Sequence, residues 1–130
     1  MTLIDTSAWV EALRRSGLPQ FKERVREIML AGQAAICEMV VLELWNGARG
    51  EEEKRSLRLI LEQLKLLPIS SEVWEASYEL ARNLRVRGIT IPAQDVLIAA
   101  TARYYDAELY HNDSHFALIP SDFGPPSAKS

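Results

Sequence analysis

The sequence predicts a single α/β domain with a mainly parallel central sheet of four to five short strands flanked by helices. Short apolar runs alternate along its 130 residues with longer stretches whose apolar residues recur at helical spacing. Strands separated by helices must return through crossovers, which favours a parallel sheet covered on both faces. A chain of this length suits one hydrophobic core, and we find no internal repeat.

The predicted strands are short runs rich in apolar residues. In chain order they are TLID (2–5), AAIC (34–37), LLPIS (66–70) and AELYH (107–111), with ALIP (117–120) as a candidate fifth. Their shortness and near-continuous apolar character are typical of strands buried in a parallel sheet. In such sheets ligands gather at the carboxyl ends of the strands.

The predicted helices occupy most of the remaining chain, at residues 6–17, 19–32, 38–50, 51–67, 71–88 and 92–106. Thr6 or Ser7 is the expected N-cap of the first helix, and Gly17 its expected end. In the fifth, Val73 and its partners at helical spacing predict one buried face. The sixth, PAQDVLIAATARYYD, is almost continuously apolar over residues 92–102, where Asp95 is the one charged residue. This pattern predicts a buried helix with a carboxylate in its first turn.

We expect the domain to span residues 1–120, followed by a loosely ordered tail at 121–130. Met1 leads directly into TLID with no basic segment, so we expect no signal peptide, and no apolar run approaches the roughly 20 residues of a membrane helix. The single cysteine, Cys37, reads as a small buried residue in a reducing compartment. These features predict a cytoplasmic protein with no membrane association.

The net charge of −3 and the sequence pI of about 5.4 argue against binding nucleic acid by simple charge attraction. A nucleic-acid function would need a local basic patch or bound metal ions. Five arginines near predicted helix ends could flank such a site, although a solvated helix face is the simpler interpretation. They are Arg14, Arg15, Arg49, Arg85 and Arg87.

Four carboxylates lie within or beside apolar sequence, where isolated charge is costly. They are Asp5, Glu43, Asp95 and Asp113. Each also has a purely structural interpretation. Asp5 could cap the first helix, Glu43 could face solvent, Asp95 could complement a helix N-terminus, and Asp113 could be a turn residue.

All four carboxylates can reach the same edge of an α/β sheet. Clustered carboxylates repel one another unless a positive charge lies between them, and no lysine or histidine occupies a matching position near Asp5, Glu43 or Asp95. Mg²⁺, or Mn²⁺ in its place, fits an oxygen ligand set, whereas zinc is disfavoured without Cys/His ligand spacing. Such a site is typical of phosphodiester hydrolysis.

Four segments in this order resemble the PIN-domain family, and specifically the VapC-type toxins of toxin–antitoxin pairs. The segments are LIDTSAWVE, VVLELWNGAR, RVRGITIPAQDVLIAATA and LYHNDSHFALI, and the resemblance covers roughly residues 2–120. It implies a metal-dependent endoribonuclease with Asp5, Glu43, Asp95 and Asp113 as its acidic residues. In this interpretation Asp5 and Asp95 anchor the metal, and Glu43 or Asp113 positions the attacking water.

The resemblance also assigns supporting roles and partners. Ser7 is expected to hold the metal-bound carboxylate or a water, and Asn112 to orient Asp113 or a water. Many relatives carry a second acid at the position of His115, which here either packs over the motif or contacts phosphate. The implied partners are an RNA substrate, a VapB-like antitoxin and a second copy of the chain.

Three other functions are compatible with the residues. One is a catalytically silent RNA- or protein-binding module that kept the fold, although the presence of all four acids argues against it. Another is a different metal-dependent phosphoesterase, such as a DNA nuclease or small-phosphate hydrolase. The third is a non-catalytic interaction protein whose acids only cap helices.

Overall fold

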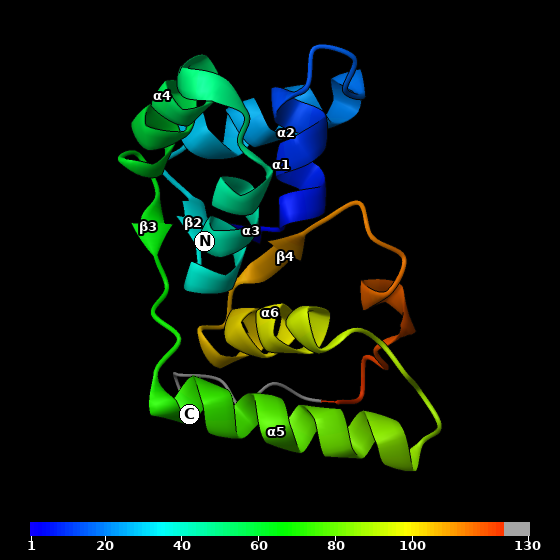
Figure 1. The fold of residues 1–130 in the computed structure, drawn as a ribbon. Coiled ribbons are helices and arrows are strands. Elements are labelled where there is room, and N and C mark those ends of the chain that lie inside the picture. The colour runs from blue at the N-terminus through cyan, green and yellow to red at the C-terminus, as the bar shows by residue number, and fades with distance from the viewer. Residues whose placement is uncertain (124–130) are drawn as a thin grey trace.

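The computed structural model describes residues 1–123 and shows a four-stranded, wholly parallel sheet with helices packed around it (Figure 1). The strands are β1 (Thr2–Ile4), β2 (Ala34–Ile36), β3 (Lys65–Leu66) and β4 (Glu108–Tyr110). Their spatial order is β3-β2-β1-β4. The first strand, β1, therefore lies inside the sheet and pairs with the last strand, β4, at the edge. The predicted fold class is confirmed.

The described chain also contains six α-helices and one short 3₁₀ helix, joined by loops. They are α1 (Thr6–Leu13), α2 (Pro19–Leu30), α3 (Glu38–Gly47), α4 (Gly50–Leu61), α5 (Ser71–Val86), α6 (Ala93–Tyr104) and the 3₁₀ helix η1 (Phe116–Leu118). Figure 1 shows α1, α2 and α4 gathered at one end of the molecule, and α5 running alongside α6 at the other. None of the helices described is both long and apolar enough to cross a membrane.

The predicted burial pattern holds for the two helices that carry most of the core packing. In α5 the predicted face is buried, at Val73, Ser77, Leu80 and Leu84. Helix α6 is buried continuously from Asp95 to Ala102, as its apolar sequence predicts. Because α6 lies between α5 and β4, both of its sides meet protein rather than water.

Cys37 and Trp9 are core residues. Cys37 is fully buried, and burial raises the pKa of its thiol to about 11, so the thiol stays protonated at neutral pH. Trp9 is 1% exposed, whereas Trp74 on α5 is 43% exposed and lies on the surface. The interpretation of Cys37 as a small buried residue is confirmed.

Several predicted elements were wrong in extent or type. The fourth helix, predicted over residues 51–67, ends at Leu61, and β3 follows within the predicted range. ALIP is not a strand: from Phe116 the backbone makes successive i→i+3 hydrogen bonds, which form η1. Strand β3 begins at Lys65 and ends before Pro68, because proline has no N–H to continue the ladder. Helix α1 ends at Leu13, well before Gly17. Gly17 is needed for another reason, since a Cβ there would overlap the backbone carbonyl of Glu11.

Of the predicted tail, residues 121–130, the structure describes residues 121–123, and residues 124–130 lie outside the described part. Its first residues pack against the domain. Arg87 forms a two-pronged ion pair with Asp122, at 2.8 and 3.1 Å, and its guanidinium carbon lies 4.2 Å from the centre of the Phe123 ring. The segment after η1 is therefore tied back to the end of α5.

Candidate functional site

The site is built where β1 and β4 end side by side. Because the two strands are parallel and paired, their carboxyl ends lie at the same edge of the sheet. The backbone N–H of Asp5 donates to the carbonyl of Tyr110 at 2.9 Å. The loop that follows Tyr110, which carries residues 111–115, therefore starts directly beside Asp5.

Asp5 is a buried helix cap that keeps one oxygen available. It is 3% exposed, and its Oδ2 accepts hydrogen bonds from the backbone N–H of Ser7 at 3.0 Å and from the Ser7 hydroxyl at 2.6 Å. The structural interpretation of Asp5 is thus correct, and the N-cap of α1 is Asp5 rather than Thr6 or Ser7. Within residues 1–123 no hydrogen bond goes to Oδ1, so capping leaves that oxygen free for a ligand.

Ser7 joins the first and last motifs of the chain. Its hydroxyl donates to Asp5 and accepts a hydrogen bond from the backbone N–H of Asn112 at 2.8 Å. Asn112 makes this contact through its backbone N–H, and the residue is exposed to solvent. Ser7 therefore fixes the Asp5 carboxylate and the start of the 112–115 loop relative to each other.

Glu43 points to the site from α3. Its Oε1 accepts a hydrogen bond from the Thr6 hydroxyl at 2.6 Å, and the residue is half-buried rather than solvent-facing. Burial raises the pKa of Glu43, and the charges of Asp5 and Asp113 raise it further, while the Thr6 hydrogen bond opposes them. The sequence analysis considered Thr6 only as a helix cap and missed its contact with Glu43. The only sequence feature that could have indicated this role is the position of Thr6 between Asp5 and Ser7.

Asp95 occupies the first turn of α6 and is 8% exposed. Burial raises the pKa of Asp95 to about 6, and the charges of Asp113 and then Asp5 add to the rise. A carboxylate that only complemented a helix N-terminus would have its charged form favoured. The shift is in the opposite direction because burial of Asp95 comes first and the negative charges of Asp113 and Asp5 add to it.

Asp113 and His115 complete the site from the loop after β4. Oδ1 of Asp113 accepts a hydrogen bond from the backbone N–H of His115 at 2.9 Å, so Asp113 is also a turn residue. The Nδ1 atom of His115 lies 2.9 Å from Oδ1 of Asp113 and 3.3 Å from Oδ2 of Asp95. One ligand atom from each of these three residues lies within 4.8 Å of the others.

The four predicted carboxylates are brought into one electrostatic neighbourhood, but not into one equally tight group. Asp95 and Asp113 form the close group with His115, whereas Asp5 and Glu43 lie outside its 4.8 Å span. Asp5 is still near enough for its charge to raise the pKa of both Asp95 and Glu43. That Asp5 and Asp95 share a metal ion stays a prediction.

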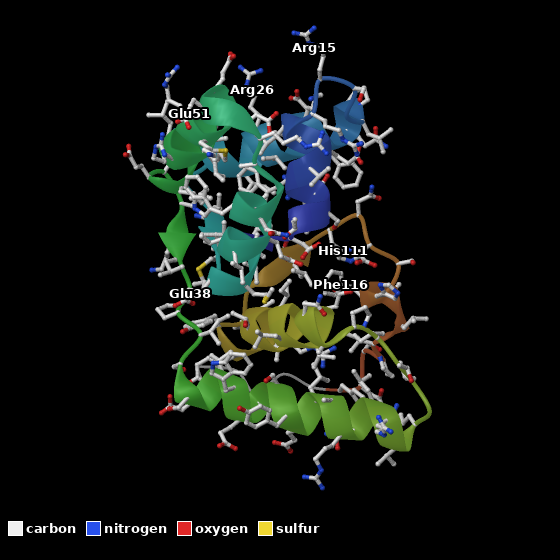
Figure 2. The ribbon with its side chains drawn as sticks, viewed as in Figure 1. Arg15, Arg26, Glu38, Glu51, His111 and Phe116 are labelled. Atoms are coloured by element: carbon white, nitrogen blue, oxygen red, sulfur yellow. The ribbon has the colours of Figure 1, made fainter. Side chains whose placement is uncertain are left out.

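The surroundings of the site are poor in positive charge. Among residues 1–123 no lysine or arginine forms an ion pair with any of the four carboxylates. The predicted flanking arginines are all exposed; Arg14 pairs with Glu11, and Arg15 points outward beyond the end of α1, away from His111 and Phe116 at the site (Figure 2). Uncompensated carboxylates with a nearby imidazole are a donor set that fits a divalent cation.

A model of the PIN domain matches residues 2–121. The chain belongs to the PIN-domain family. The matched segment covers every residue of the candidate site, from Asp5 to His115. The resemblance carried by the four sequence motifs is confirmed.

Named relatives of this PIN domain are ribonucleases. It is 33% identical over 123 residues to "VapC ribonuclease Mb1587" of Mycobacterium bovis, covering 92% of this chain and 91% of the relative. It is 34% identical over 128 residues to "Ribonuclease VapC19" of Mycobacterium tuberculosis, covering 97% and 99%. The similarity therefore runs through nearly the whole length of both relatives.

Solved structures share the fold. The VapBC2 complex of Rickettsia felis, bound to a promoter DNA fragment, contains a chain that aligns with a TM-score of 0.77 at 22% identity, covering 92% of each chain. FitAcB of Neisseria gonorrhoeae aligns with a TM-score of 0.78 at 23% identity, covering 92% of this chain and 93% of that one. A toxin–antitoxin complex of Klebsiella pneumoniae aligns at 0.74 and 25%, with the same coverage.

The raised pKa of Asp95 predicts how the metal-free PIN domain responds to pH. The folded pKa of about 6 exceeds the ordinary value of 3.8, so folding favours the protonated carboxyl. Its contribution to stability is fully present below about pH 4 and is lost as pH rises through 6. Relative to Asp95→Asn, the wild type should lose on the order of 2 kcal/mol across this window.

Urea unfolding of both proteins in a chelator, at intervals between about pH 4 and 7, measures this difference. Comparing the two proteins cancels the titration of carboxylates that lie far from Asp95. A difference that stayed constant across the window would show that Asp95 titrates normally and that the site is less crowded than the structure indicates.

Proposed function

We propose that this PIN domain is the toxin of a type II toxin–antitoxin pair, a Mg²⁺- or Mn²⁺-dependent endoribonuclease of the VapC type. The observation that carries the proposal is the gathering of Asp5, Glu43, Asp95 and Asp113 around one sheet edge, without a lysine or arginine partner among residues 1–123. Relatives named as VapC ribonucleases, similar over nearly their full length, support the reaction class.

The residues present fit a divalent cation. Asp5 and Asp95 are the proposed anchors: both are buried, and the Oδ1 atom of Asp5 has no hydrogen bond among the described residues. Asp113 adds an oxygen within the close group at Asp95. When bound, the cation would supply a polarised water and charge stabilisation at the phosphate and the leaving oxygen.

The chain's own side chains orient the reactants. Glu43 or Asp113 positions the water that attacks phosphorus and accepts its proton, and the raised pKa of Glu43 makes its carboxylate a stronger base. Ser7 holds Asp5 at a fixed angle and ties it to the loop that carries Asp113. Thr6 steadies Glu43 through its hydroxyl. Hydrogen bonds thus hold Asp5, Glu43 and Asp113 in place within the site.

The proposed protein partner is a small VapB-like antitoxin. Solved structures that share the fold include toxin–antitoxin complexes. An arginine from the antitoxin's tail would meet the unpaired carboxylates, because a guanidinium fork matches a carboxylate through two hydrogen bonds. The net charge of −3 suits a basic inhibitory segment. A cytoplasmic location is part of the same proposal, and it is supported by the proposed RNA substrate.

The predicted homodimer has a candidate surface on α5. Trp74 and Tyr78 are 43% and 55% exposed, and their ring centres lie 6.2 Å apart. They border a largely apolar groove of about 490 Å³ between α5 and the start of α6. Exposed aromatic residues beside a groove are typical of protein interfaces, so self-association stays part of the proposal.

A parallel degradation assay tests the function. Purified chain is incubated with total bacterial RNA, single-stranded DNA or a chromogenic phosphate ester, with Mg²⁺, Mn²⁺ or a chelator. We expect discrete RNA fragments only when a divalent ion is present, and no product from the other two substrates. Preferential DNA or ester hydrolysis would favour another phosphoesterase, and the absence of any ion-dependent product would favour a silent module.

A further inference from the structure

His115 stands at the centre of the close group although it is not a carboxylate. Its Nδ1 atom is buried and lies 2.9 Å from Asp113 and 3.3 Å from Asp95. Neither contact has the angle of an N–H···O hydrogen bond, so Nδ1 has no hydrogen-bond partner among the described residues. A polar atom buried this close to two carboxylates and aligned with neither is unusual.

The spacing of the three donor atoms matches the ligand shell of a divalent ion. Neighbouring ligands of an octahedral ion with bonds of ~2.1 Å lie about 3.0 Å apart, and opposite ones about 4.2 Å apart. The two distances from Nδ1 of His115 are close to the first value, and the group's overall span of 4.8 Å leaves room for the second. An ion between the groups would also give Nδ1 the partner it lacks.

The imidazole is held in place by its own loop. The backbone N–H of His115 donates to the Asp113 carboxylate, so the two residues move together. The next residue, Phe116, is buried, and its ring packs against His111 with centroids 4.8 Å apart. Sequence reasoning expected His115 to pack over the motif or contact phosphate. In the structure Nδ1 lies close to the two carboxylates, and both expectations stay predictions.

We propose that Nδ1 of His115 is a ligand of the catalytic metal and that this nitrogen shifts the site's preference from Mg²⁺ toward Mn²⁺. The inference rests on the proposed metal-dependent function. Carboxylate and water oxygens suit Mg²⁺ and Mn²⁺ alike, whereas imidazole nitrogen favours transition ions. The substitution His115→Asp would replace this nitrogen with an oxygen donor, so one change gives an all-oxygen site for comparison.

Metal binding, rather than activity, tests the inference. Calorimetric titrations with Mg²⁺ and Mn²⁺ at about pH 8 compare the wild type with His115→Asp and His115→Ala. We expect the ratio of Mn²⁺ to Mg²⁺ affinity to fall at least ~10-fold in both variants, since even loss of an outer partner of a ligand costs that much. Thermal melts without metal verify that each variant is folded.

The other histidine of the chain provides a matched control. Nδ1 of His111 accepts a hydrogen bond from the backbone N–H of Asp113 at 3.3 Å, and His111→Asn keeps an acceptor near that position. Pulsed electron spin resonance of bound Mn²⁺ should show modulation from a coordinated nitrogen in the wild type and in His111→Asn. The modulation should be lost in both His115 variants.

The outcomes separate this inference from the proposed function. If both ions bind the wild type but the affinity ratio is unchanged in His115→Asp and no nitrogen modulation appears, His115 is not a ligand, while the metal-dependent function stands. Loss of modulation in His111→Asn alone would likewise overturn the assignment to His115. If neither ion binds the wild type at millimolar concentration, both the inference and the proposed metal chemistry fail.

Discussion

Asp5→Asn is expected to lower metal-dependent RNA cleavage by at least ~100-fold while leaving the fold intact. Loss of a carboxylate ligand should exceed the 10–100-fold cost that follows loss of a ligand's hydrogen-bond partner. Asparagine serves as well as aspartate at a helix N-cap, so the hydrogen bond from the Ser7 backbone to Asp5 can persist. The variant therefore separates the catalytic role of Asp5 from its role as a cap.

The measurement is the initial rate of RNA cleavage in Mn²⁺, paired with circular dichroism and a thermal melt. Glu108→Gln is the matched control, because it removes one exposed carboxylate at the amino end of β4, away from the site edge. The control should retain wild-type activity. Retained cleavage in Asp5→Asn with the same ion dependence would contradict the assignment of Asp5 as a metal anchor.

Divalent ions should raise the melting temperature of the wild type, and Asp95→Asn should lose most of that rise. An ion at about 100 times its dissociation constant stabilises the folded state by about 2.7 kcal/mol, which for a domain of this size is roughly 10 °C. Without metal, Asp95→Asn should be as stable as the wild type or more so, since burial and the charges of Asp113 and Asp5 disfavour the charged carboxylate.

Melts with Mg²⁺, Mn²⁺ or a chelator near neutral pH measure both effects without knowledge of the RNA target. Glu75→Gln on the exposed side of α5 is the control for loss of one negative charge, and it should keep the full metal effect. A wild type that does not respond to millimolar ion, combined with a destabilised Asp95→Asn, would make Asp95 a structural residue of α6 and remove the basis of the proposed chemistry.

Much of the fold could be predicted from local pattern. Helices α5 and α6 follow from apolar spacing, and the parallel sheet follows from alternation of short apolar runs with helices. The predicted strands that proved wrong lie where the spacing of apolar residues carries little information. ALIP and LLPIS are short apolar runs, and for such runs neighbouring residues decide between strand, 3₁₀ helix and loop. The turn at Asp113 and the missing N–H of Pro68 made that decision.

The candidate site was predictable as a set of residues rather than as a geometry. Each of the four acids stood out because charge within apolar sequence is costly. The structure brings them into one electrostatic neighbourhood, with only Asp95 and Asp113 in the close group. The structural interpretations of Asp5 and Asp113 are correct as well, since both cap or turn the backbone while facing the site. A carboxylate has two oxygens, so local and functional roles coexist.

The sequence by itself determined the fold class, the four acids and the motifs that link the chain to PIN domains, because these depend on residue type and near-neighbour spacing. Only the tertiary structure decided which groups meet. Strand order placed Asp5 beside the loop after Tyr110, and burial on α6 raised the pKa of Asp95. The same packing brought the His115 nitrogen to two carboxylates, a contact set by distances between segments that no spacing along the chain encodes.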